Sequence, residues 1–153
     1  ARFRTQQSQL VKPRARDAFV GLSLATSRDD LVRAVVDGVA AQVAWLARAA
    51  AYDLGAPIAR LRVDGGLARS RTLLQTQADL LHAPVDVYPS PDATALGVAA
   101  LARLGAGLAS SARDAVGSWT PSATYAPRIG ADEAEARLRA WRRAVEATMD
   151  LAP

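Results

Sequence analysis

The sequence predicts an α/β fold of one domain, in which helices cover a small parallel sheet. The first indication is size and composition: 153 residues, half of them hydrophobic and many of them alanine, suffice for one core packed mainly by helices. The second is the order of elements in residues 58–89, where a strand, a helix and a second strand follow one another with short loops. Two strands joined by a helix pair in parallel through a right-handed crossover.

The first predicted helix covers residue 28 to about residue 52. Ser27 is suited to cap its start, with Asp30 three residues later reaching back as a capping box. Gly55 ends it, as glycine commonly does after a helix. Before it, residues 18–24 are apolar enough for a strand or an extended lead-in, and after it residues 58–63 form the first strand of the strand-helix-strand unit.

The second predicted helix runs from about Ser70 to residue 81. Its apolar face contains Leu73, Leu74, Ala78 and Leu81. His82 marks its end, because histidine tolerates the left-handed backbone common there. A second strand follows in residues 83–89, and a helix of small residues begins at residue 92 or 94. Residues 107–130 are typical of a loop, and a last amphipathic helix spans residues 132–149.

The composition excludes several kinds of site. The chain has no cysteine and one histidine, which argues against disulfides, thiolate or histidine metal sites and a histidine-centred catalytic triad. No signal peptide is visible and the apolar runs are short and interrupted, so we expect a cytoplasmic protein without a membrane partner. The net charge of +4 comes partly from a basic arm, residues 1–17. Elsewhere arginines alternate with acids, so nucleic-acid binding is only a third alternative.

A strand running into Asp64-Gly65-Gly66 and then into a helix is the main candidate for a site. In an open parallel sheet, ligands bind beyond the carboxyl ends of the strands. Glycines let the backbone approach a ligand, and a helix N-terminus favours phosphate. The spacing fits neither a Walker A loop nor G-x-G-x-x-G. A tight strand-to-helix turn without any ligand explains the same residues.

Three segments resemble the C-terminal lobe of FGGY-family carbohydrate kinases and, within that family, the glycerol kinase branch. They are Asp64-Gly65-Gly66, the run QTQADLL in residues 75–81 and the run TALGVA in residues 94–99. Segments ARDAFVGL upstream and YAPRIG downstream extend the resemblance to about residues 13–149. It implies a partial actin-like ATPase (ribonuclease H-like) C-terminal lobe, here residues 18–150, of a kinase that uses ATP with Mg²⁺ to phosphorylate a polyol or sugar. In that kinase the chain would contribute the adenosine-side wall of the ATP site.

The resemblance also assigns nucleotide-binding residues. It implies that Gly65, Gly66 and Ser70 bind the nucleotide, with Gly66 against it. Glycerol kinases have asparagine at the position of Ser70, whereas xylulokinase-like members use serine near this point.

Several parts of the family pattern are not found in this sequence. Residues 5–11 do not match, and the family's N-terminal lobe is absent, with its catalytic aspartate and most sugar contacts. Also absent is an early part of the C-terminal lobe, with a strand meander and a phosphate-contacting turn. We therefore assign no catalytic residue and no metal ligand, and expect the chain alone to be inactive. The alternative is a non-catalytic relic or interaction module.

The same departures predict a partner. Without the meander, the strand at residues 58–63 or the one at residues 85–88 lies at an open sheet edge, and such an edge attracts another strand. We expect pairing with the missing lobe or self-association through that edge.

Overall fold

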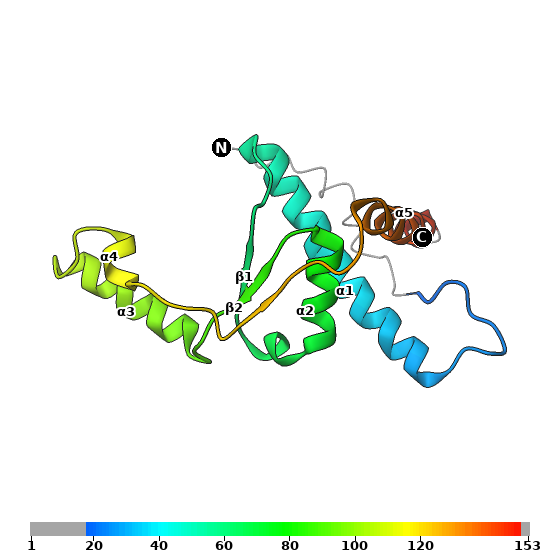
Figure 1. Cartoon of the computed structure of the whole chain (residues 1–153), viewed down its shortest axis with the longest axis horizontal. Helices are drawn as coiled ribbons and strands as arrows, with labels where there is room; N and C mark the ends of the chain where they lie inside the picture. Colours follow the sequence, from blue (N-terminus) through cyan, green and yellow to red (C-terminus); the bar gives the residue numbers. More distant parts are fainter. Residues whose placement is uncertain (1–17, 151–153) are drawn as a thin grey trace.

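The computed structural model describes residues 18–150, except for the side chain of Asp150, so the predicted basic arm lies outside the described residues. Within this range the α/β class is confirmed, and Figure 1 shows the arrangement. The elements in chain order are α1 (Arg28–Leu54), β1 (Leu61–Val63), the 3₁₀ helix η2 (Gly66–Arg69), α2 (Arg71–Leu81), β2 (Val85–Val87), α3 (Ala93–Gly105), α4 (Ala112–Val116), β3 (Ala123–Tyr125) and α5 (Ala131–Asp150).

The predicted helix ends are confirmed in their local chemistry. The Ser27 hydroxyl accepts a hydrogen bond from the Asp30 N–H, and the Asp30 carboxylate accepts one from the Ser27 N–H at 2.9 Å, which completes the capping box. That bond to the Ser27 backbone, aided by the Ser27 hydroxyl, lowers the pKa of Asp30. Gly55 and His82 end α1 and α2 in left-handed conformations, with φ of 65° and 52°.

The sheet differs from the prediction because it is mixed. β1 and β2 pair in parallel as expected, but β3 adds to the other side of β2 in antiparallel orientation. The order β1-β2-β3 places β2 in the centre, so the expectation that residues 85–88 form an open edge is wrong, whereas β1 is an edge strand of this sheet. β3 lies in the region predicted as loop. A three-residue strand has too few positions to show alternation, and its pairing with β2 defines it.

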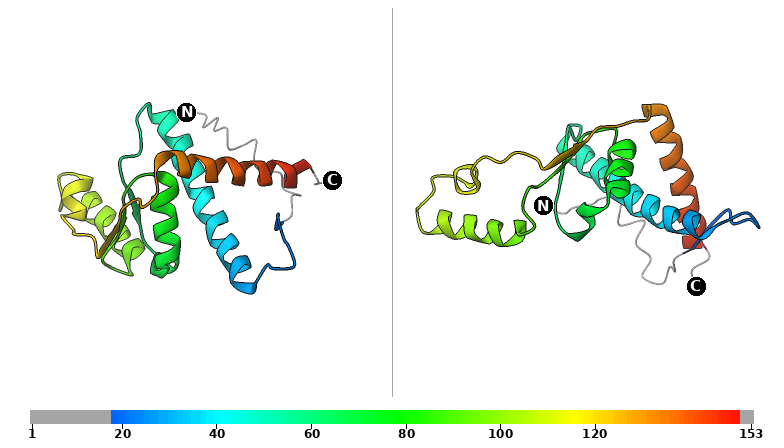
Figure 2. Two further views of the ribbon diagram at one scale, coloured as in Figure 1. Left: turned by 45° about the vertical axis from the view of Figure 1, so that its right-hand side comes forward. Right: turned by 60° about the horizontal axis from the view of Figure 1, so that its bottom comes forward.

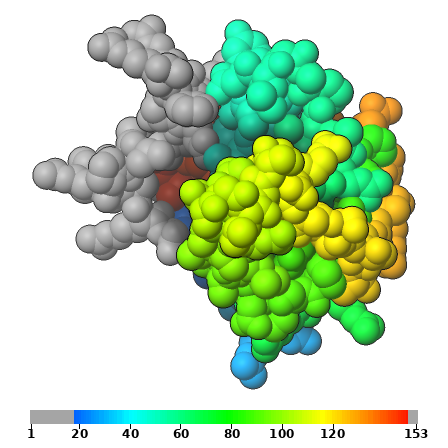
Figure 3. Space-filling view, turned by 90° about the vertical axis from the view of Figure 1, so that its left-hand side faces the viewer, coloured from blue at the N-terminus to red at the C-terminus, as the bar shows by residue number. Residues whose placement is uncertain are grey.

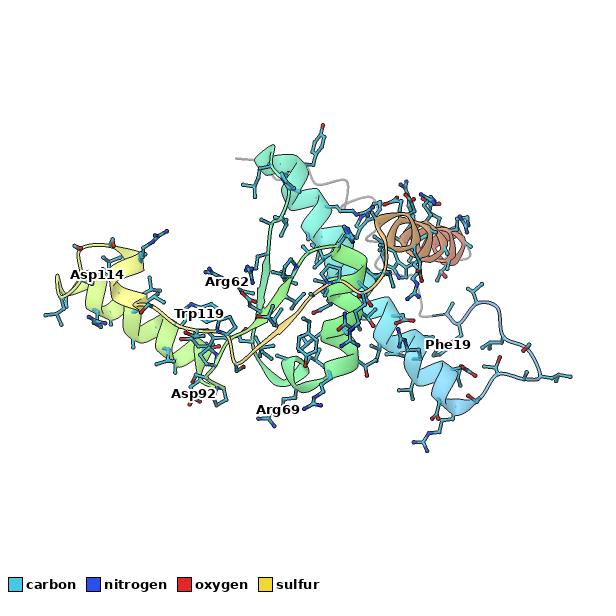
Figure 4. The ribbon with its side chains drawn as sticks, viewed as in Figure 1. Phe19, Arg62, Arg69, Asp92, Asp114 and Trp119 are labelled. Carbon is cyan, nitrogen blue, oxygen red and sulfur yellow. The ribbon has the colours of Figure 1, made fainter. Side chains whose placement is uncertain are left out.

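One further short segment was predicted wrongly for a similar reason. The predicted loop at residues 107–130 also contains α4, a single turn capped by Ser111, whose hydroxyl accepts from the Asp114 N–H at 3.1 Å. Of the two alternatives predicted for residues 18–24, the strand does not form; the segment leads into α1 as irregular chain, with Phe19 half exposed. Figure 4 shows Phe19 on this segment, apart from the sheet. With no strand beside it, the apolar pattern there has nothing to pair with.

The described part of the chain is layered, with α2 between the sheet and the outer helices α1 and α5 (Figure 2). One side of α2 buries Leu73 and Leu80 against the alanines of α1 and Leu138 of α5. Its other side buries Leu74 and Ala78 against Val85 of the sheet. The predicted apolar face of α2 is therefore confirmed, and it is split between two cores. Small alanines on α1 let the two helices approach closely.

Helix α1 is long and apolar enough to cross a membrane by length and composition alone. In this structure it instead contributes Ala40, Ala41 and Ala44 to the core shared with α2. Beside this core, Arg33 pairs with Asp37 at 2.8 Å and also donates to the Thr76 hydroxyl of α2 at 3.3 Å. A buried alanine face with ion pairs beside it is ordinary for the outer helix of an α/β protein. The cellular compartment remains a prediction.

Helices α3 and α4 form an arm that stands away from the other layers, visible on the left of Figure 1 and facing the viewer in Figure 3. The two helices pack on each other through Ala100, Ala109 and Ala115, with Leu104 beside them. The outer surface of α3 leaves Val98 and Leu101 more than 60% exposed.

Candidate functional site

A pocket of about 210 Å³ opens at the carboxyl ends of β1 and β2. One side is the turn after β1, with Asp64, Gly65, Gly66, Ala68 and Arg69. The other side is the chain after β2, residues 87–91. The two strands bring these segments together because parallel neighbours have their carboxyl ends on the same end of the sheet. This is where ligands bind in open α/β sheets.

The glycine pair has two different structural roles. Gly65 has φ 88° and ψ −175°, a region that is essentially closed to residues with a side chain. Gly66 begins η2 with no such requirement, and a Cβ placed on it meets no heavy atom within 4 Å. The turn therefore requires glycine at 65, whereas glycine at 66 leaves open space over the backbone in the pocket wall. The fold does not explain the absence of a side chain at Gly66, but a ligand would.

Ser70 directly follows the residues that line the pocket. Its hydroxyl accepts a hydrogen bond from the Leu73 N–H at 3.3 Å and so caps α2. Its own N–H donates to the Leu67 carbonyl at 3.0 Å, which closes the turn of η2. Ser70 thus has a structural role in the helix start, and its predicted contact with a nucleotide remains a prediction.

The second wall of the pocket was missed by the sequence reasoning. Tyr88, Pro89 and Pro91 face the glycine turn from the segment after β2. The sequence did hold a signal for this wall. Parallel neighbouring strands have their carboxyl ends side by side, so the residues after the second strand should lie next to the glycine turn. Among the described residues, the charged side chains lining the pocket are Asp64 and Arg69.

A polar cluster lies on the face of the sheet opposite α2. The Asp86 carboxylate on β2 accepts hydrogen bonds from Arg60 at 2.7 and 2.8 Å and from the Thr124 hydroxyl at 2.7 Å. These bonds, led by that from Thr124, lower the pKa of Asp86 although its side chain is only 5% exposed. The cluster ties the chain before β1 and strand β3 to the central strand.

The QTQAD run on α2 holds the chain that leads to α5. The Asp79 carboxylate accepts from the Arg128 N–H at 2.8 Å and from the Gln75 amide at 2.9 Å. The same Gln75 amide nitrogen donates to the Ala126 carbonyl at 2.8 Å. These residues therefore anchor residues 126–128 on α2, away from the pocket.

No group of three or more histidine, aspartate or glutamate side chains that could hold a metal ion occurs within residues 18–149. The pocket itself contributes Asp64 as its acidic residue. Accordingly, no chemical step is assigned to a metal here.

The fold belongs to a known class. A model of the FGGY family of carbohydrate kinases, C-terminal domain, matches residues 2–106. The chain is therefore a member of the FGGY family of carbohydrate kinases. The match begins within the stretch that we predicted to be a separate arm.

Among curated proteins, the glycerol kinase of Bordetella parapertussis is 43% identical over 134 residues, which are 88% of this chain and 26% of that protein. The glycerol kinase of Myxococcus xanthus is 37% identical over 88% of this chain and 27% of its own length. The chain thus spans about a quarter of the length of the curated relatives it matches. This chain corresponds to the C-terminal domain of a glycerol-kinase-like carbohydrate kinase.

Solved structures agree with this fold. Xylulose kinase from Rhodospirillum rubrum superposes with a TM-score of 0.68 and 30% identity, over 87% of this chain and 27% of that one. Plasmodium falciparum glycerol kinase, solved with ADP, superposes with a TM-score of 0.74 at 24% identity, over 88% of this chain and 27% of that one. The predicted actin-like ATPase lobe is confirmed as a fold.

Proposed function

We propose that this chain contributes the adenosine-side wall of the ATP site in an ATP-dependent carbohydrate kinase of glycerol kinase type. The observation that carries this proposal is the bare backbone of Gly66 in the pocket beyond β1 and β2. Pockets for whole small-molecule ligands measure roughly 300–1,000 Å³. A volume of about 210 Å³ suits one portion of a nucleotide, with the rest of the site supplied by other parts of the kinase.

Phosphoryl transfer needs positioning, a metal and charge neutralisation together. The family resemblance assigns the general base and the β- and γ-phosphate contacts to parts of the kinase outside this sequence, and Mg²⁺ would accompany the ATP there. The chain alone is therefore inactive. With glycerol, xylulose or gluconate as acceptor, ADP release by this chain equals the no-enzyme control. Turnover that Gly66→Asp abolishes would show that the chemistry resides in this chain.

Nucleotide binding is tested separately from activity. Amide spectra of the labelled chain are titrated with ADP, and we expect weak binding, about millimolar, or roughly −4 kcal/mol. Gly66→Val removes the shifts around residues 61–70, because its side chain fills the space over the backbone. Gly130→Val is the matched control, since Gly130 also has open space around its Cβ and lies away from the pocket. Equal shifts in the wild type and Gly66→Val refute the assignment.

The second candidate is a non-catalytic relic or interaction module. It is favoured by the backbone of Gly65, which requires glycine for the turn whether or not a ligand binds. It predicts no ADP-dependent shift near Gly66 at any concentration. The ADP titration therefore separates the two candidates.

A partner is proposed at the open edge of β1. Leu61 and Val63 use their backbone groups to pair with β2, as the bonds from Leu61 N–H to Pro84 and from Tyr88 N–H to Val63 show. Arg62 lies between them, so its N–H and C=O point to the open edge. We propose that the remainder of the kinase, or a second copy of this chain, adds a strand there.

Sedimentation at micromolar concentration, with and without a chain carrying the rest of a glycerol kinase, measures this association. Arg62→Pro removes the outward N–H without touching the ladder to β2, and it should weaken association. Arg62→Ala is the control, because it also loses the side chain but keeps the N–H. A monomer of 16.1 kDa under all conditions, with no binding of a hydrophobic dye, contradicts the proposal.

A further inference from the structure

Tyr88 occupies the wall of the pocket that faces the glycine turn. It follows β2 directly, and its N–H donates to the Val63 carbonyl at 2.9 Å, which fixes its backbone to the end of β1. The side chain is half-buried and lines the pocket together with Pro89 and Pro91. The pocket thus lies between a wall of ring-bearing residues and a turn whose two glycines present only backbone.

Trp119 holds the Tyr88 ring in place. The two rings meet edge to face, with centroids 4.9 Å apart and an interplanar angle of 71°, a favourable aromatic geometry. The Arg62 guanidinium lies 5.1 Å from the centre of the Trp119 ring, as a cation–π contact. Figure 4 shows Arg62 and Trp119 side by side next to the sheet.

The segment that carries Trp119 is itself fastened to the sheet. The Ser122 N–H donates to the Val87 carbonyl at 3.0 Å, one residue before Tyr88. A tyrosine fixed by its own backbone, by a neighbouring tryptophan and by the segment that carries that tryptophan is a pre-organised surface. Pre-organisation of this kind lowers the entropic cost of binding.

The chemistry of this wall selects a flat group with polar edges. Aromatic rings stack on nucleobases, and the phenol hydroxyl of tyrosine both donates and accepts hydrogen bonds. The charged side chains Asp64 and Arg69 lie on the opposite side of the pocket, with the glycine turn. We infer that Tyr88 contacts the nucleoside part of the bound nucleotide and that Trp119 positions it. This inference rests on the proposed function, since it takes a nucleotide as the ligand.

The three tryptophans provide a built-in reporter. Trp45 and Trp141 lie together at the contact of α1 and α5, with ring centroids 6.4 Å apart, in a different layer from Trp119. In a spectrum of indole N–H groups, the Trp119 signal is assigned with Trp119→Phe. We expect adenosine and ADP to shift it and inorganic pyrophosphate to leave it unchanged, while Trp45 and Trp141 stay as internal references. A Trp119 signal that moves with pyrophosphate but not with adenosine overturns the inference.

Variants of Tyr88 test the contact directly. Tyr88→Ala should weaken ADP binding at least about fivefold, the lower end of what one stacked base contributes. Tyr88→Phe keeps the ring and should stay within about twofold. Tyr52→Ala is the matched control, because Tyr52 is 84% exposed at the far end of α1. If Tyr88→Ala does not fold, Tyr88→Leu replaces the ring at similar volume.

The outcomes separate this inference from the proposed function. Wild-type binding of ADP that depends on Gly66 but is equal in Tyr88→Ala, or in Tyr88→Leu in its place, overturns the inference alone. No binding of ADP to the wild type overturns the proposed function and the inference with it.

Discussion

Removing the Arg60 side chain and removing the Asp86 charge should lower the stability of the fold by different amounts. The Asp86 side chain is 5% exposed, whereas the Arg60 side chain is 46% exposed. Arg60→Ala leaves a buried carboxylate with the Thr124 hydroxyl as its remaining hydrogen-bond partner. Asp86→Asn leaves a guanidinium that water can already reach and keeps an acceptor for Thr124. The carboxylate cannot be solvated without opening the sheet, so Arg60→Ala should be the more destabilising change.

The magnitudes follow from this exposure. Removing one partner of a fully buried ion pair costs about 3–5 kcal/mol. Because Arg60 is half exposed and Thr124 remains, solvent screening reduces this to about 2–3 kcal/mol for Arg60→Ala. Asp86→Asn replaces the ion pair by a hydrogen bond from the guanidinium to a neutral amide oxygen and should cost about 1–2 kcal/mol.

The assay is urea unfolding followed by circular dichroism at pH 7 and again near pH 3. The folded-state pKa of Asp86 is lowered, so its stabilising contribution is complete above the unfolded value of about 3.9 and is lost as the pH falls through the folded pKa. Arg60→Ala raises that folded pKa. The difference in unfolding free energy between wild type and variant should therefore be full at pH 7 and should shrink as the pH falls below about 4 toward the folded pKa of the wild type. Equal costs for both variants, or a gap that does not change with pH, refute this reasoning.

Further substitutions test the glycine turn, the cap of α2 and the anchor of the chain that leads to α5. Gly65→Ala forces a side chain into a glycine-only backbone region and should cost about 1–3 kcal/mol in urea unfolding, whereas Gly66→Ala should change stability little. Ser70→Ala should lose about 1 kcal/mol with the cap of α2, and Ser70→Asn should restore it in the same assay. Asp79→Ala leaves the Arg128 N–H without its acceptor, so limited trypsin digestion should cut faster after Arg128 than in Asp79→Asn; equal rates contradict the anchoring role.

Features set by neighbours in the chain could be predicted from the sequence. Ser27 and Asp30 form the capping box they predict, and Ser70 begins α2, because a cap bonds residues two or three positions away. Gly55 and His82 end helices because their own backbone preferences decide it. The glycine turn after β1 and the family membership followed from short motifs with fixed spacing, and the family match confirms the membership.

Features set by distant residues needed the tertiary structure. β3 carries no pattern in its three residues and exists through its pairing with β2, which makes the sheet mixed and leaves β1 at its edge. The partners of Asp86 come from 26 and 38 residues away, and Tyr88 meets Trp119 across α3 and α4. The sequence alone therefore determined the helix ends, the glycine turn and the family, because these depend on short-range spacing. Only the folded chain decided which second wall faces the turn, since contacts between distant segments leave no periodic signal in either of them.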